Sequence, residues 1–149
     1  MKSSSAAAPA DRILSECIAV QVRLLNRVIT SLYDAALRPL GLRISQMNIL
    51  MVASRLGIAQ PAVVCKLLQM DASTLSRNVD RMLTHGWLER VPAHDAREQP
   101  FRITGKGAML LEHAVTAWEQ GQRGARKILG KQGVSVLSEV TRQFRRLPP

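Results

Sequence analysis

A helix with two chemically different sides is predicted by residues 71–82, which read Asp71-Ala72-Ser73-Thr74-Leu75-Ser76-Arg77-Asn78-Val79-Asp80-Arg81-Met82. Its apolar side chains recur three or four positions apart and share one face: Leu75, Val79, Met82 and Leu83. The opposite face carries hydroxyl and guanidinium groups: Ser73, Thr74, Arg77 and Arg81. Asp71 stands where an N-cap residue is expected. We therefore expect a helix from Asp71 to His85-Gly86 that packs on one side and exposes polar groups on the other.

The segments on either side of this helix predict a winged helix-turn-helix. A short helix is expected from Gln60-Pro61 to Leu68, and residues 69–71 form the turn between the two helices. After Gly86 the apolar period changes from helical to alternating, which predicts strands at residues 87–91 and 101–104. The polar loop 92–98 joins them, so the hairpin is expected to act as a wing.

This arrangement favours binding to double-stranded DNA. Arginine bonds guanine O6 and N7 in the major groove, and short hydroxyl side chains reach bases or phosphates. A solvated amphipathic helix would show a similar pattern on its own, but the neighbouring helix and hairpin favour DNA. The candidate DNA-binding residues are Ser73, Thr74, Ser76, Arg77, Arg81, Lys66, Arg90 and Arg97. Among them, Lys66 and Arg90 are expected to contact the DNA backbone.

The rest of the chain predicts further helices, so the fold class is mainly α with a small β-hairpin wing. A first helix is expected from an Asp11 cap to Leu37, at about 37 Å long, before Pro39 and Gly41 end it. A second is expected from a Ser45 cap to Gly57. Helix returns from Gly107, with a bend or break near Gly121, Gly124 or Gly130, and a last helix carries apolar residues from 134 to 144. The first helix is too long for a compact domain to bury unless something large packs on it.

Composition and charge agree with a single globular domain that binds a polyanion. The 149 residues are 46% hydrophobic and only 3% aromatic, which predicts a mainly aliphatic core. The formal net charge is +10, with +2 in residues 1–40, +3 in 41–103 and +5 in 104–149. Such a surplus points to a polyanionic partner or a membrane surface, although a genome that overuses arginine would also produce it. Because the surplus is spread along the chain, a binder that uses only a basic tail is disfavoured.

The ends and the cysteines favour a cytoplasmic protein without a membrane segment. No apolar run approaches the roughly 18 residues that span a bilayer. Residues 1–10 lack the apolar core of a signal peptide, and we expect them to be a disordered tail. Two cysteines, Cys17 and Cys65, exclude a disulfide-rich scaffold. His85, His94 and His113 lack the spacing of a metal site, and neither a catalytic arrangement nor a cofactor motif stands out.

Four segments in order resemble the MarR family of bacterial transcription regulators. Residues 67–82, followed by Gly86-Trp87-Leu88-Glu89-Arg90, resemble its recognition region. Asp95-Ala96-Arg97 resembles its Asp-x-Arg wing signature, and residues 103–107 resemble the Thr-x-x-Gly that starts its next helix. Residues 37–42, followed by Ser45, resemble its link between the first two helices. The match spans residues 30–120, and the four motifs together are far more specific than any one of them.

The resemblance implies an intertwined homodimer in which the first and the last two helices of each chain interlock. Residues 11–149 would form one domain, with dimerisation helices at 11–40 and 108–149 and a DNA-binding lobe at 41–107. It implies that Arg97 enters the minor groove and that Asp95 orients the wing by pairing with a nearby arginine. Ala96 stands where the family commonly has a basic residue. A small aromatic or phenolic effector would bind between the dimer helices and the lobe and change the spacing of the recognition helices.

The residues and the resemblance together predict a ligand-responsive repressor that binds a pseudo-palindromic DNA site as a dimer, and not an enzyme. Two alternatives stay open. One is a redox-sensing regulator switched by Cys17, although the aromatic residues that flank the cysteine of peroxide-sensing relatives are missing here. The other is a sequence-neutral nucleic-acid binder that depends on the +10 charge.

Overall fold

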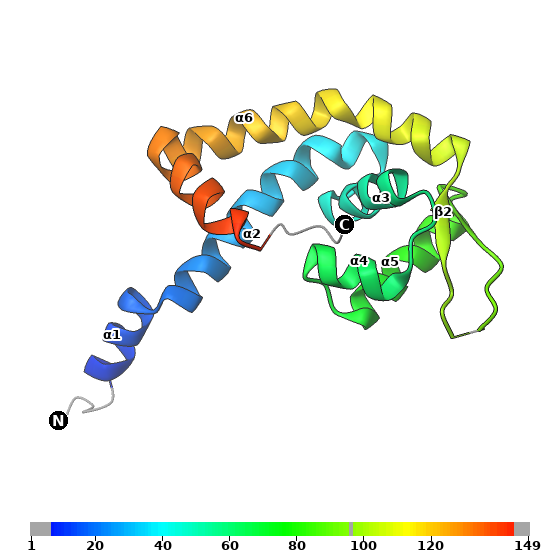
Figure 1. Cartoon of the computed structure of the whole chain (residues 1–149). Helices are drawn as coiled ribbons and strands as arrows, with labels where there is room; N and C mark the ends of the chain where they lie inside the picture. Colours follow the sequence, from blue (N-terminus) through cyan, green and yellow to red (C-terminus); the bar gives the residue numbers. More distant parts are fainter. Residues whose placement is uncertain (1–6, 96, 145–149) are drawn as a thin grey trace.

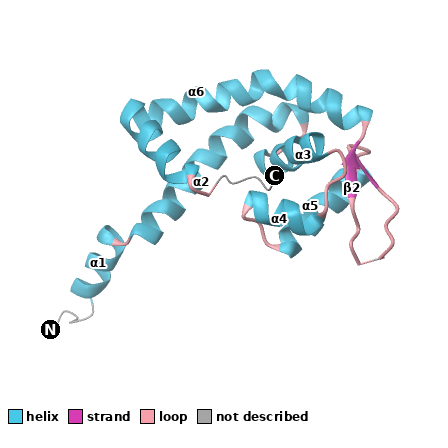
Figure 2. Ribbon diagram, viewed as in Figure 1, coloured by secondary structure: helices cyan, strands magenta, loops and turns pink. Residues whose placement is uncertain are grey.

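The computed structural model describes residues 7–95 and 97–144 and shows two long helices beside a compact lobe of short helices and a hairpin (Figure 1). The helices before the lobe are α1 (Ala7–Glu16) and α2 (Ile18–Leu37), and the helix after it is α6 (Gly105–Arg142). The lobe holds the short 3₁₀ helix η1 (Arg38–Leu40), then α3 (Ile44–Leu56), α4 (Pro61–Leu68) and α5 (Ala72–Thr84). The strands are β1 (Leu88–Arg90) and β2 (Phe101–Ile103). Figure 2 shows that strands occur only in this hairpin within the described chain, which confirms the predicted fold class.

The first helical segment differs from the prediction in two ways. Helix begins at Ala7, so residues 7–10 belong to α1 rather than to a disordered tail, and Asp11 lies inside the helix instead of capping it. Alanine is the best helix former, and proline is tolerated in a first turn, which explains the earlier start. The helix then breaks at Cys17, whose ψ of 113° is extended. The side-chain amide of Gln21 donates to the Ser15 carbonyl at 3.0 Å and so satisfies one main-chain acceptor at the break.

The start of α3 also differs, because its cap comes from a distant part of the chain. Arg43 is the N-cap residue, and Ser45 lies within the first turn. The Asp34 carboxylate of α2 accepts the main-chain N–H of Ile44 at 2.8 Å, and the Gln46 side chain accepts that of Arg43 at 3.0 Å. Two donors that a helix start normally leaves unsatisfied are therefore bonded. The predicted end at Gly57 is confirmed, with a φ of 70°.

The predicted break in the last helical segment occurs at Gly130, where φ is 66° and ψ is 173°. Gly121 and Gly124 stay helical and face α2 instead. A Cβ atom added to Gly121 would lie 2.6 Å from Cδ1 of Tyr33, whereas one added to Gly124 would lie at least 3.5 Å from Leu32. The glycine at 121 therefore lets α6 approach α2 closely, and the Tyr33 hydroxyl donates to Gln122 across this contact.

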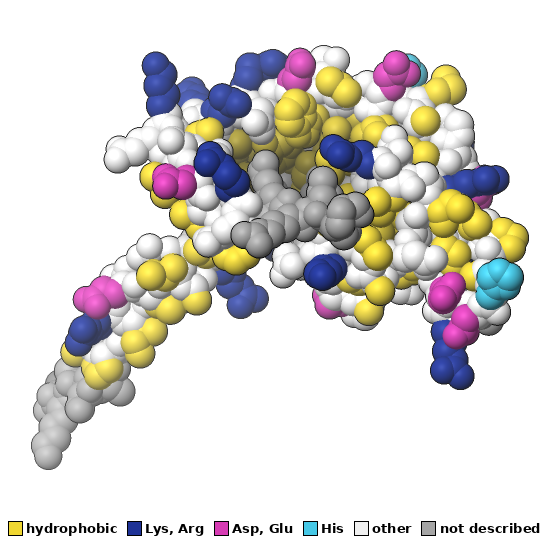
Figure 3. Space-filling model, viewed as in Figure 1, with side chains coloured by type: hydrophobic (Ala, Val, Ile, Leu, Met, Phe, Trp, Pro, Cys, Tyr) yellow, Lys and Arg dark blue, Asp and Glu magenta, His cyan; other side chains and the backbone are white. Residues whose placement is uncertain are grey.

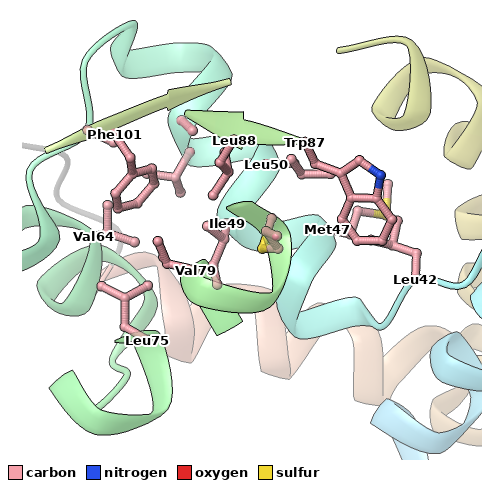
Figure 4. Packing of buried hydrophobic residues seen from close by; sticks show 14 of the residues in the cluster. Leu42, Met47, Ile49, Leu50, Val64, Leu75, Val79, Trp87, Leu88 and Phe101 are labelled. Atoms are coloured by element: carbon pink, nitrogen blue, oxygen red, sulfur yellow. The ribbon is translucent and has the colours of Figure 1, made fainter. Parts of the chain in front are cut away.

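The core fills the lobe and is almost entirely aliphatic, as the composition predicts (Figure 4). Side chains that are at most 2% exposed come from α3, α4, α5, both strands and the loop before α3: Leu42, Ile49, Leu50, Val64, Leu75, Val79, Met82, Leu88 and Phe101. The main chain of Phe101 also pairs with that of Ala59 through hydrogen bonds of 2.8 and 3.1 Å. The base of the hairpin is thus bonded to the segment that leads into α4, so the wing and the helix-turn-helix share one rigid base.

Candidate nucleic-acid interface

Helices α4 and α5 form the predicted helix-turn-helix. The turn between them places Gln69 in the left-handed region at a φ of 50°, and the N–H of Met70 bonds back to the Cys65 carbonyl at 3.0 Å. Leu75, Val79 and Met82 are buried, as the apolar period predicts. The other side of α5 stays accessible in the described chain. Exposed there are Ser73, Ser76, Arg77 and Arg81, while Thr74 is half-buried.

The first turn of α5 is organised by the carboxylate of Asp71. Its Oδ1 accepts the main-chain N–H of Thr74 at 2.8 Å and the Ser73 hydroxyl at 2.6 Å, and its Oδ2 accepts the Thr74 hydroxyl at 2.7 Å. Bonds from the Ser73 and Thr74 hydroxyls, together with the main-chain bond, hold the pKa of Asp71 well below its usual range. The predicted cap is confirmed, and it also fixes two candidate DNA-binding side chains.

The hairpin has the predicted position next to α5. β1 and β2 pair antiparallel, with Leu88 opposite Ile103 and Arg90 opposite Phe101. Arg97 is exposed in the loop between the strands. Ala96, where a basic residue was expected by analogy, lies outside the described residues. The described parts of the loop therefore keep one accessible guanidinium close to the helix-turn-helix.

The expected role of Asp95 in orienting the wing stays a prediction, but its carboxylate bonds to a main-chain N–H rather than to an arginine side chain. The Asp95 carboxylate accepts the main-chain N–H of Arg97 at 2.9 Å, and the N–H of Glu98 bonds to the Asp95 carbonyl. Within residues 7–95 and 97–144, the ion pairs are Arg12–Glu16, Arg90–Asp80 and Arg102–Glu89, so no arginine in this part of the chain pairs with Asp95. The carboxylate closes its own turn because the residue two positions further supplies a nearby donor.

Arg90 is the arginine that links the wing to α5. Its Nη1 donates to the Gln99 carbonyl at 2.8 Å, and its Nη2 lies 3.5 Å from Oδ1 of Asp80. Local sequence patterns do not single out Asp80 or Gln99, because their contact with Arg90 depends on the hairpin register. The expectation that Arg90 contacts the DNA backbone stays a prediction, although two of its nitrogen atoms already have partners within the chain.

A further cation stabilises the end of α5. Lys106 Nζ donates to the His85 carbonyl at 2.8 Å, where the helix leaves main-chain acceptors without partners. His85 is the C-cap residue, and its ring stacks on Trp87 with centroids 4.5 Å apart. Thr104, whose hydroxyl donates to the Gly86 carbonyl at 2.6 Å, caps α6 next to this point. The two ends of α5 are therefore both held by side-chain bonds.

The remaining candidates have different settings. Lys66 is exposed in the last turn of α4 and has free access to solvent. Cys65 is half-buried and lines a cavity of about 610 Å³ between α4, α5 and the wing. Cys17 is half-buried at the junction of α1 and α2, and its redox role stays a prediction. In the described part of the chain, no helix combines the length and the apolar character that crossing a bilayer requires.

Comparison with known proteins agrees with this geometry. Residues 40–98 match the model of the MarR family. The multiple antibiotic resistance protein MarR of Salmonella typhimurium is 30% identical over 92 residues, which are 61% of this chain and 64% of that protein. The matched segment thus spans less than two thirds of the relative's length.

Two similar solved structures were determined with DNA. A mutant MarR from Escherichia coli, complexed with operator DNA, superposes with a TM-score of 0.75 at 24% identity, over 88% of this chain and 96% of that one. The transcriptional regulator MOSR of M. tuberculosis, in complex with DNA, gives a TM-score of 0.70 at 26% identity, over 88% of this chain and all of that one. The lobe and the long helices together therefore have the winged-helix fold of MarR regulators.

Proposed function

We propose that this chain, which matches the MarR family over residues 40–98, is a transcription regulator that binds a pseudo-palindromic site in double-stranded DNA as a homodimer. The observation that carries the proposal is the accessible face of α5, which exposes Ser73, Arg77 and Arg81 beside the wing. Arg77 and the hydroxyl groups would read or anchor to the major groove, and Arg97 would enter the minor groove. Lys66 would contact phosphate.

The dimer is supported by apolar surface on the long helices. Large apolar side chains of α1 and α2 are exposed by 46–75%: Ile13, Leu14, Ile18, Val22, Leu24 and Val28. Figure 3 shows apolar side chains spread along the arm that these helices form. The last part of α6 adds Val136, Leu137 and Val140, and Phe144 follows just after the helix; each is at least 44% exposed. Contiguous apolar surface of this extent marks an interaction site, and the two sets of helices of two chains would cover each other.

The two-fold arrangement of the dimer would make its DNA affinity depend on the spacing of the two recognition helices. The recognition helices of a dimer must enter half-sites about 34–36 Å apart. A small effector that changes this spacing lowers DNA affinity and so releases the repressor. A cavity of about 480 Å³ at the joint of α2, η1 and α3 supports an acidic aromatic or phenolic effector, because three arginines, Arg27, Arg38 and Arg43, line it beside one carboxylate, that of Asp34.

Selection of bound fragments from sheared genomic DNA by the purified full chain tests the proposal. We expect a few selected duplexes to bind at least about 10³-fold more tightly than shuffled duplexes of the same length and salt concentration. Sedimentation should give two chains for each duplex. A specificity ratio near one would instead identify a sequence-neutral binder, and a hydroxybenzoate that leaves the selected complex intact would argue against the effector.

A further inference from the structure

We propose that Arg90 is a positioning residue that fixes the wing relative to α5, and that it does not act as a phosphate contact. The inference rests on the proposed function, because the distance from α5 to Arg97 matters only if both enter the grooves of one duplex. Three parts of the lobe meet at this guanidinium: the end of β1, the returning arm of the wing at Gln99, and α5 at Asp80.

Arg90 donates a hydrogen bond to the carbonyl of Gln99 on the returning arm of the wing. Gln99 has a φ of 41°, a left-handed backbone conformation that is unusual for a residue other than glycine. Its carbonyl accepts Arg90 Nη1 at 2.8 Å, next to the main-chain bond of 3.0 Å from Val91 to the Pro100 carbonyl. Arg90 thereby holds the two arms of the wing together at the point where the strands end.

A cavity of about 610 Å³ lies between the described part of the wing and the helices. Arg97, Glu98 and Gln99 line it from the wing, and Leu75, Ser76 and Val79 line it from α5. Arg90 also lines this cavity, and its ion pair with Asp80 joins the hairpin to α5 there, so this polar link helps to set the angle of the loop.

The charge of Asp80 also bears on the role of Arg90. A carboxylate on α5 weakens the attraction of that helix to phosphate. Side chains that are 37% and 63% exposed form only a weak ion pair, so stability alone does not account for the contact. The Asp80 carboxylate helps to orient the guanidinium of Arg90, which also bonds to Gln99. This positioning compensates for the repulsion between the carboxylate and phosphate.

The two roles of Arg90 predict opposite effects of Asp80→Ala. If Arg90 bound phosphate, this variant would free the guanidinium and remove a negative charge, so all duplexes would bind more tightly. For a positioning role, we expect the selected duplex to bind several-fold more weakly, while shuffled duplexes bind equally or more tightly. Arg90→Lys keeps the charge but loses the fork, and we expect it to lose affinity as Arg90→Met does.

A double-mutant cycle with Arg97→Ala tests whether Arg90 acts on DNA affinity through the position of Arg97. We expect Arg97→Ala to weaken the selected complex about tenfold in the wild type and only about two- to threefold in the Arg90→Met background. Arg55→Met, which removes an exposed arginine of α3, serves as the matched charge control and should leave the effect of Arg97→Ala at about tenfold. An undiminished effect in Arg90→Met, or tighter binding by Asp80→Ala of every duplex, would overturn the proposal.

Hydrogen exchange in the free protein tests the same role without DNA. The amide of Val91 should exchange faster in Arg90→Met than in the wild type and in Arg55→Met, because its bond to Pro100 loses support. Unchanged exchange in Arg90→Met would also overturn the positioning role. The wild type could show no preference for any duplex while the Val91 amide still exchanges faster in Arg90→Met. In that case the proposed function fails, and the structural link through Arg90 stands.

Discussion

The carboxylate of Asp71 accepts the main-chain N–H of Thr74 at 2.8 Å and so closes the first turn of α5, the helix proposed to face DNA. Asp71→Ala removes this cap together with the bonds from the Ser73 and Thr74 hydroxyls. We expect a lower midpoint of urea denaturation and weaker binding of every duplex, because the start of α5 loosens. Asp71→Asn keeps a good capping oxygen and should lie between the wild type and Asp71→Ala. Equal midpoints of all three proteins would contradict the capping role.

The same carboxylate gives a pH dependence with a defined sign. Its pKa in the folded chain is lower than the usual value of 3.8, so the folded state binds a proton less readily than the unfolded state. The stabilisation by Asp71 is therefore complete above the unfolded pKa and is lost as the pH falls toward the folded pKa. We expect the difference in urea midpoint between the wild type and Asp71→Asn to be largest near pH 7 and to shrink between pH 4 and pH 2. A difference that grows over this range would mean that the shift has the opposite direction.

Two glycines one turn apart in α6 should respond to alanine in opposite ways. At Gly121 the new Cβ would lie 2.6 Å from the Tyr33 ring, so the contact between α2 and α6 must open, and we expect a loss of about 1–3 kcal/mol. At Gly124 the nearest atom lies 3.5 Å away, and the higher helix propensity of alanine should stabilise by about 0.5–1 kcal/mol. Urea denaturation at pH 7 measures both variants. Stabilisation of both would show that α6 does not press on α2 at residue 121.

The comparison of sequence and structure shows which features local patterns can predict. The period of Leu75, Val79 and Met82, the turn before α5 and the alternation around Phe101 were enough for the helix-turn-helix and the wing, because each depends on neighbours in the chain. The cap of α3 could not be predicted, since it comes from Asp34, ten residues before Ile44.

The candidate interface also contains some residues that local patterns predict and others whose contacts depend on distant parts of the chain. The exposed side of α5 follows from helical geometry, and Ser73, Arg77 and Arg81 are exposed as predicted, whereas Thr74 is half-buried. The role of Asp80 was missed, because it depends on how the hairpin brings Arg90 back over α5. The role of Asp95 stays a prediction, although in the described chain its carboxylate bonds within the turn of the wing and not to an arginine side chain.

The apolar face at the end of α6 predicts how the proposed dimer can be dissociated. Val140 is 50% exposed and shares a helix face with Val136 and Leu137. Val140→Glu should shift the protein toward monomer in sedimentation equilibrium by at least about tenfold in dissociation constant, since burying an unpaired carboxylate is costly. Ser135→Glu adds the same charge on the opposite side of α6 and serves as the control. A control variant that dissociates equally would show that net charge, and not this face, governs association.

Base reading and phosphate binding can be separated by two basic side chains on neighbouring helices. Arg77 lies on the exposed face of α5, and Lys66 lies in the last turn of α4. Arg77→Ala should cost about 1–3 kcal/mol on the selected duplex and relax the base preference at one position in each half-site. Lys66→Ala should weaken selected and shuffled duplexes alike and reduce the slope of log K against log salt by about one for each chain, because one phosphate contact is lost. Fluorescence anisotropy at several salt concentrations measures both quantities. If Arg77→Ala loses equally on selected and shuffled duplexes, Arg77 binds the backbone, and base reading must come from the hydroxyl side chains of α5 or from Arg97.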